Sequence, residues 1–188
     1  MDDADDLEAV LRASQDLGFL GARPITEVIE HARAFVRALD GLTVEGSEPP
    51  TVIDLGSGGG VPGLVIAHDR PDLRLALLDR RAKRTDFLER MVRRLGWSDR
   101  VRVICEDAER AVARERGHYA AAVARGFGPP DVTLGIGASL VRLGGRVVIS
   151  EPPEGDRWDP ELLASCGVIR DETPGHDPRV AVFHRRES

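Results

Sequence analysis

The feature that most constrains the fold of this chain is an alternation of short apolar runs with amphipathic stretches. The apolar runs have the length and β-branched content of buried strands, and they cover residues 51–55, 73–78, 101–105, 119–124, 146–150, 168–169 and 180–184. Stretches with helical spacing of apolar residues lie between them, at 61–69, 82–95, 107–116 and 131–143. Strands that alternate with helices run parallel. The pattern therefore predicts an α/β protein with a Rossmann-like, seven-stranded, mostly parallel sheet and helices on both faces.

The two ends of the chain depart from this alternation. The turn-forming segment 173–178 is too short for a crossover helix, so we expect the last strand to be antiparallel. Two amphipathic helices are predicted at 6–20 and 25–39, followed by a linker rich in glycine and proline. We therefore expect an N-terminal helical extension with its linker at 1–50, and one Rossmann-like domain at 51–188.

Composition restricts the class of protein. Apolar residues make up 41% and charged residues 31% of the chain, a globular balance, and no run approaches the ~20 apolar residues of a membrane helix. Four of the first six residues are aspartates, unlike the basic start of a signal peptide. Cys105 and Cys166 lack metal-motif spacing and lie within strand-like runs, and we expect Cys105 to be buried filler. These features predict a cytoplasmic protein without a membrane segment, a disulfide or a metal.

A glycine-rich loop at 54–63 follows the first strand and opens a helix, where doubly wound sheets bind ligands. From Gly58 it also satisfies the G-x-G-x-x-G pattern of dinucleotide sites, which stays as an alternative. Against that alternative, the carboxylate of Asp54 would repel a pyrophosphate, and Pro62 lacks an N–H for an anion. S-adenosylmethionine has no phosphate and two cationic groups. We therefore favour it as the cofactor, with contacts from Asp54, Gly56, Ser57 and Gly58.

Acidic residues also follow the second and third strands. Asp79 ends the second strand, where its carboxylate can accept hydrogen bonds from both ribose hydroxyls. The alternative is that Asp79 only caps the helix that begins near Ala82. The segment Asp107-Ala108-Glu109 can frame the adenine, although acids are also common in the first turn of a helix.

Three segments together resemble the RsmG/GidB family of guanine-N7 methyltransferases that act on small-subunit ribosomal RNA. They are Ile53 to Gly63 with its Val-Pro-Gly end, the Asp79-x-x-x-Lys83-Arg84-x-x-Phe87-Leu88 run, and Ala124-Arg125-Gly126-Phe127. The resemblance implies a class I S-adenosylmethionine-dependent methyltransferase with ribosomal RNA as its partner. It further implies cofactor contacts from Gly56 and Val61, an adenine edge at Ala108-Glu109, Arg125 beside the cofactor pocket, and a basic helical pair, Lys83 and Arg84.

Other parts of the chain differ from that family. The stretch 25–33 is acidic where the family is basic, and Ser150-Glu151-Pro152-Pro153 stands where the family tends to Leu-Lys-Gly. Residues 1–50 hold eleven acids against four arginines, whereas 80–102 hold nine basic residues against three acids. The basic stretch suits RNA, although a solvated helix face is an alternative. A methyltransferase of a small molecule or protein, or a non-catalytic relative, are the other functions that we retain.

Methyl transfer to guanine N7 requires no general base, because the nitrogen lone pair is free. We therefore nominate no catalytic residue. For a hydroxyl or amine acceptor the candidate bases are Glu151 and His31. Arg125 has three interpretations, namely a structural salt bridge, a cofactor contact and an RNA phosphate contact. The candidate substrate residues are Lys83, Arg84, Arg125 and Glu151, and the two tryptophans are expected to pack rather than stack on a base.

Overall fold

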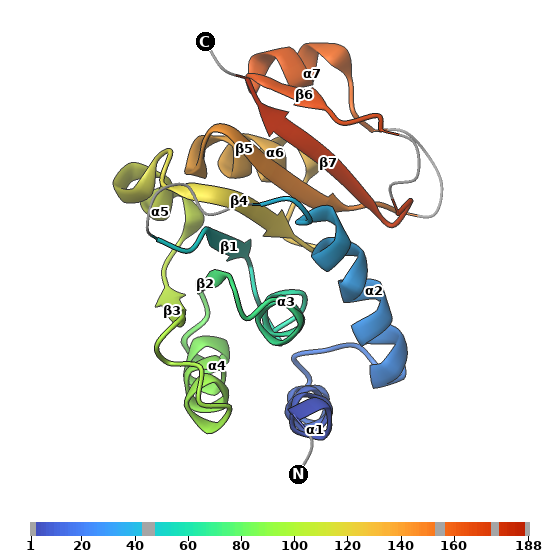
Figure 1. Ribbon diagram of the computed structural model, residues 1–188, viewed down its shortest axis with the longest axis vertical. Coiled ribbons are helices and arrows are strands. Elements are labelled where there is room, and N and C mark those ends of the chain that lie inside the picture. Colours follow the sequence, from blue (N-terminus) through green and yellow to red (C-terminus); the bar gives the residue numbers. More distant parts are fainter. Residues whose placement is uncertain (1–2, 43–47, 153–156, 174–176, 187–188) are drawn as a thin grey trace.

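The described residues form one sheet with the strand order β3-β2-β1-β4-β5-β7-β6 (Figure 1). The computed structural model describes residues 3–42, 48–152, 157–173 and 177–186. Within these residues only β7 runs antiparallel to its neighbours, β5 and β6. The strands are β1 (Thr51–Leu55), β2 (Arg74–Asp79), β3 (Val101–Cys105), β4 (Tyr119–Ala124), β5 (Val141–Ser150), β6 (Val168–Arg170) and β7 (Val180–Arg185).

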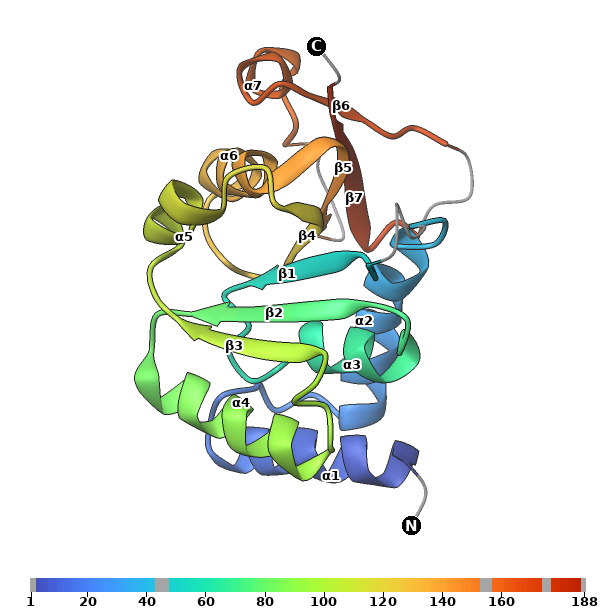
Figure 2. The ribbon, with the colours of Figure 1, turned by 60° about the vertical axis from the view of Figure 1, so that its left-hand side comes forward.

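Helices cover both faces of this sheet (Figure 1 and Figure 2). Among the described residues, four helices pack on one face and three on the other. Side chains of a strand alternate between the two faces, so each strand contributes to both cores. Val52 and Leu75 face the first group, and Ile53 and Ala76 face the second. The first group is α1 (Asp3–Asp16), α2 (Ile25–Ala38), α3 (Gly63–Asp69) and α4 (Ala82–Arg94), and the second is α5 (Ala108–Glu115), α6 (Pro130–Leu140) and α7 (Pro160–Ser165).

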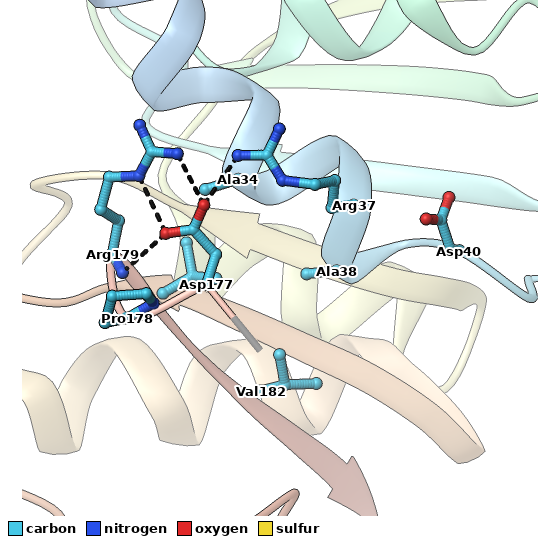
Figure 3. A pocket seen from close by; sticks show the side chains of 9 residues that line it. Ala34, Arg37, Ala38, Asp40, Asp177, Pro178, Arg179 and Val182 are labelled. Atoms are coloured by element: carbon cyan, nitrogen blue, oxygen red, sulfur yellow. Dashed lines mark hydrogen bonds and ion pairs between the residues drawn. The ribbon is translucent and has the colours of Figure 1, made fainter. Parts of the chain in front are cut away.

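A cluster of charges joins α2 to the start of β7. Figure 3 shows the Asp177 carboxylate between two guanidinium groups. Arg179 Nη2 donates to Asp177 Oδ2 at 2.6 Å, and Arg37 Nη2 donates to the same oxygen at 2.7 Å. These bonds, that from Arg179 above all, hold the pKa of Asp177 well below its ordinary value. The cluster therefore connects α2 to the start of β7, the strand next to the edge strand β6.

The predicted alternation of strands and helices and the antiparallel last strand are confirmed, with three differences in detail. The helix predicted from Val61 begins at Gly63, because the glycine loop continues through Pro62. The strand predicted from Arg146 begins at Val141, directly after α6, and contains an irregularity in its pairing with β4. Helix α7 was not predicted, because six residues are too few for a periodic pattern.

The cysteine predictions were wrong in two respects. Cys105 is exposed rather than buried, because β3 is an edge strand and Cys105 is its last residue. Cys166 lies outside the strands and ends α7. The prediction for the tryptophans is confirmed. Trp158 packs edge-on against Phe183 with ring centroids 4.6 Å apart, and Trp97 packs beneath the guanidinium of Arg100.

Parts of two predicted segments, 43–47 of the linker and 174–176 of the turn, with His176, lie outside the described residues. In the portion of the chain that the structure describes, the helices are all too short or too polar to cross a membrane.

Candidate active site

The loop after β1 passes three times through the left-handed backbone region that favours glycine. Gly56, Gly58 and Gly60 have φ values of +67°, +53° and +96°. A Cβ atom on Gly56 would also lie 2.8 Å from the ring of Phe127. The backbone N–H of Ser57 donates to the carbonyl of Leu78 at 2.9 Å. The loop is therefore held at the carboxyl end of β2, with the ring of Phe127 closely packed on it.

Asp54, the last residue but one of β1, lies beneath this loop. Its side chain is fully buried, and its Oδ2 accepts a hydrogen bond from the backbone N–H of Gly63 at 3.1 Å. Its Oδ1 has no hydrogen-bond partner among the described residues. Burial raises the pKa of Asp54 to about 7, although the Gly63 N–H and the charge of Arg125 act in the opposite direction. Asp54 thus supports the loop from below and places a titratable carboxyl group there.

Asp79, at the end of β2, connects the glycine loop to the start of α4. Its side chain is 5% exposed. Asp79 Oδ2 accepts from the backbone N–H of Gly58 at 3.0 Å, and Oδ1 accepts from the backbone N–H of Arg81 at 2.9 Å. Arg84 Nη1 lies 3.5 Å from Oδ2. The carboxylate is therefore fixed in position by two neighbouring segments, and Arg81, the residue before α4, is one of its donors.

A hollow of about 430 Å³, called here the loop hollow, opens beside Asp79 at the carboxyl edge of the sheet. Its walls come from the segments that follow β1, β2, β3 and β4, the place where doubly wound sheets bind ligands. Its charged lining residues are Asp79, Arg80, Arg81, Arg84, Glu106, Asp107 and Glu109. The others are glycine or apolar, namely Gly56, Leu78, Ala108, Gly126, Phe127, Gly128, Pro129 and Val132.

A second hollow, of about 370 Å³, lies between α2 and the ends of β4 and β5 and is called here the α2 hollow. Gly126 lines both hollows, so they adjoin at the residue after Arg125. The lining residues of the α2 hollow are Leu20, Gly21, Arg23, Glu27, Val28, His31, Arg125, Gly126, Ser150 and Glu151. The site therefore has two compartments side by side.

Arg125 is the charged group at the junction of these compartments. No described residue accepts a hydrogen bond from its guanidinium, and the carboxyl group of Asp54 is its attractive electrostatic neighbour. Burial lowers the pKa of Arg125, and burial together with the charge of Arg125 lowers the pKa of His31. A partly buried arginine whose guanidinium has no hydrogen-bond acceptor among the described residues is suited to an anionic group of a ligand.

The structure brings most of the predicted site residues together. Gly56, Asp79, Arg84, Asp107, Ala108 and Glu109 line the loop hollow, and Arg125 and Glu151 line the α2 hollow. The other predicted residues line neither hollow. Ser57 and Val61 are buried with Asp54, Gly58 is covered by Arg84, and Lys83 is exposed on α4.

The sequence analysis did not predict several of the lining residues as ligand contacts, Phe127 and Val132 of the loop hollow among them. Phe127 was noted only as part of a motif, although it packs on Gly56, and Val132 was not noted at all. Val132 is 43% exposed, which is unusual for a valine in a helix that covers the sheet. Val132 could have been identified from the sequence, because it is an apolar residue in the first turn of a helix that follows a site motif.

The strand order, the glycine loop after β1 and the buried carboxylate at the end of β2 together define a Rossmann-like class I methyltransferase fold. The chain belongs to the GidB family, described as rRNA small subunit methyltransferase G, whose family model matches residues 6–152.

Individual relatives agree with this family. The chain is 40% identical over 128 residues to the ribosomal RNA small subunit methyltransferase G of Nocardioides sp., covering 61% of this chain and 50% of the relative. It is 37% identical over 103 residues to the protein of the same name from Thermotoga neapolitana, covering 55% of this chain and 44% of the relative. The chain thus spans about half the length of these curated relatives. A Corynebacterium glutamicum protein of known structure is similar in fold, with a TM-score of 0.62, 15% identity, and coverage of 98% of this chain and 91% of that one.

Proposed function

We propose that this chain is an S-adenosylmethionine-dependent methyltransferase that acts on small-subunit ribosomal RNA, with guanine N7 as the acceptor. The observation that carries the proposal is the pair of adjoining hollows, one beside the buried carboxylate of Asp79 and the other beside Arg125. Two compartments that meet at Gly126 suit the transfer of a small group between two bound molecules. Membership of the GidB family supports the identity of both molecules.

The residues present fit S-adenosylmethionine. Asp79 is fixed and nearly buried, as a carboxylate that accepts hydrogen bonds from ribose hydroxyls must be. Ala108 and Phe127 offer apolar surface to the adenine. Arg125 has no hydrogen-bond acceptor among the described residues and would bind the cofactor carboxylate. Asp54 lies beneath the loop and would act by holding the loop in position. The remaining proposed cofactor residues are Gly56, Ser57, Gly58, Val61, Asp107 and Glu109.

The bound cofactor supplies a methyl group that is already activated on a sulfonium. The protein then has to align the acceptor and exclude water, and positioning of this kind contributes of order 7–11 kcal/mol. Guanine N7 has a free lone pair, so no residue is assigned as a general base. His31 and Glu151 line the hollow in which an acceptor would sit, and their proposed role is contact with that acceptor.

The outer face of α4 supports an RNA acceptor. The helix buries Phe87, Leu88 and Val92 against the sheet. Its exposed face carries four basic side chains, Lys83, Arg90, Arg93 and Arg94, against two acids, Asp86 and Glu89, of which Glu89 lies 3.7 Å from Arg93. Such a face binds phosphates with an affinity that falls steeply with salt. We expect binding of small-subunit ribosomal RNA to weaken at least tenfold between 50 and 200 mM KCl. Binding that is independent of salt in this range would contradict an RNA acceptor.

Calorimetric titration with S-adenosylmethionine tests the cofactor. We expect micromolar binding to the unmodified chain, and at least tenfold weaker binding to Asp79→Ala, which corresponds to about 1.4 kcal/mol. Asp79→Asn is the second variant, because it retains an acceptor for the loop, and Asp86→Ala on the exposed side of α4 is the control. Equal affinities of all four proteins would mean that Asp79 only connects the loop to α4.

Transfer of labelled methyl groups to small-subunit ribosomal RNA tests the reaction itself. We expect label in 7-methylguanine after digestion of the RNA to nucleosides. Cofactor binding without any labelled nucleoside would identify a non-catalytic relative. If the same assay on a cell extract labelled only small molecules or protein, the proposal of an RNA acceptor would be overturned.

A further inference from the structure

The carboxylate of Glu151 is held in a fixed position at the wall of the α2 hollow. Glu151 follows the last residue of β5, and its backbone N–H donates to the carbonyl of Arg179 at 2.8 Å. The Nε1–H of Trp158 donates to Glu151 Oε1 at 2.5 Å. Trp158 is itself 5% exposed and packs edge-on against Phe183 in the core. A core aromatic pair therefore orients this carboxylate.

The second oxygen of this carboxylate, Oε2, remains available for a ligand. The Glu151 side chain is 9% exposed, and both of its described contacts, the second being Arg157 Nη2 at 3.7 Å, are made by Oε1. Among the described residues, none donates to Oε2. A carboxylate oxygen in a hollow is suited to N–H or O–H donors, and a second lone pair on Oε1 lets two adjacent donors bind together.

The arrangement of donors differs among the four RNA bases. Guanine presents two adjacent donor groups, N1–H and the 2-amino group. Adenine has an acceptor at N1, cytosine has an acceptor at N3 beside its amino group, and uracil has a single N–H between two carbonyls. Single-stranded RNA bases are commonly recognised along this edge. Guanine held in this way keeps N7, on its opposite edge, free.

We infer that Glu151 is a specificity-determining residue that selects guanine by accepting hydrogen bonds from N1–H and the 2-amino group. The inference rests on the proposed function, in that the α2 hollow is taken as the acceptor site. Glu151 acts by binding and takes no part in bond making.

The indole signals of the two tryptophans provide a direct test without turnover. The Nε1–H of Trp158 donates to Glu151, so its nitrogen-15 NMR signal reports on that carboxylate, whereas Trp97 lies elsewhere and serves as the internal reference. The protein with S-adenosylhomocysteine is titrated with guanosine, inosine and adenosine 5′-monophosphates. We expect guanosine monophosphate to shift the Trp158 signal, inosine monophosphate, which lacks the 2-amino group, to bind at least tenfold more weakly, and adenosine monophosphate to bind more weakly still.

Two variants complete the test. Glu151→Gln keeps an oxygen for Trp158 but replaces an acceptor by an amino group, and we expect it to reduce the preference for guanosine over adenosine monophosphate at least tenfold. Glu161→Gln, on the exposed side of α7 and outside both hollows, should leave the preference unchanged. The inference is overturned if the unmodified protein binds the three nucleotides equally, or if Glu151→Gln retains the full preference.

These outcomes are separable from the fate of the proposed function. Methylated RNA together with an unchanged nucleotide preference in Glu151→Gln would reject only the role of Glu151. Guanine selection through Glu151 without cofactor binding or methylation would reject the proposed reaction and leave a guanine-binding site.

Discussion

The buried carboxyl group of Asp54 gives the folded chain a specific dependence on pH. Its pKa rises from 3.8 to about 7 on folding, chiefly because of burial. The folded protein therefore binds this proton more tightly than the unfolded chain, and stability falls as the pH rises from about 4 to 7. The rise in pKa corresponds to about 4 kcal/mol in total, of which about 2.5 kcal/mol falls between pH 5 and pH 8.

The variant Asp54→Asn removes this titration and retains an oxygen that can accept from the Gly63 N–H. We expect the variant to gain about 2.5 kcal/mol relative to the unmodified chain between pH 5 and pH 8. The free energy of unfolding is measured with urea at each pH. His31, whose pKa is lowered on folding, titrates nearby with the opposite sign, but it is present in both proteins and cancels in the difference.

Asp86→Asn, which changes an exposed carboxylate on α4, is the matched control and should give no pH-dependent difference. If the stabilities of Asp54→Asn and the unmodified chain follow parallel curves from pH 5 to pH 8, the carboxyl group is not desolvated in the folded state and the reasoning about the loop is refuted.

Three further predictions concern local contacts. Gly56→Ala should lose about 2–3 kcal/mol of stability, against about 1 kcal/mol for Gly96→Ala. Both residues have a left-handed backbone, but only at Gly56 would the added Cβ meet another side chain, the ring of Phe127. Equal losses in urea unfolding would disprove the contact. Tyr119→Phe should lose about 1 kcal/mol, since the hydroxyl is hydrogen-bonded on both sides in a half-buried cluster; an unchanged melting temperature would count against it. Asp177→Asn should lose about 1 kcal/mol at pH 7, and the loss should fade as the pH falls below 3.8, because the folded-state pKa of Asp177 is depressed; a loss that persists in acid would mean that shape rather than charge matters.

Local chemistry in the sequence was enough to predict the class of fold and the edge of the sheet that carries the site. The glycines of the loop after β1 and the acid at Asp79 mark strand ends, and parallel strands bring their carboxyl ends to one edge. The resemblance carried by the segments around Asp54, Lys83 and Arg125 agrees with the family that matches the chain.

Only the tertiary structure determines which of these residues line a hollow that can hold a ligand. Asp54 and Asp79 lie at the carboxyl ends of neighbouring strands. Asp54 is sealed under the glycine loop, whereas Asp79 forms part of the wall of the loop hollow. The α2 hollow depends on α2 and the segment before it lying beside the carboxyl ends of β4 and β5, and no local sequence pattern encodes this arrangement. The orientation of Glu151 by Trp158 has the same origin, because side-chain direction follows from packing between distant segments rather than from spacing along the chain.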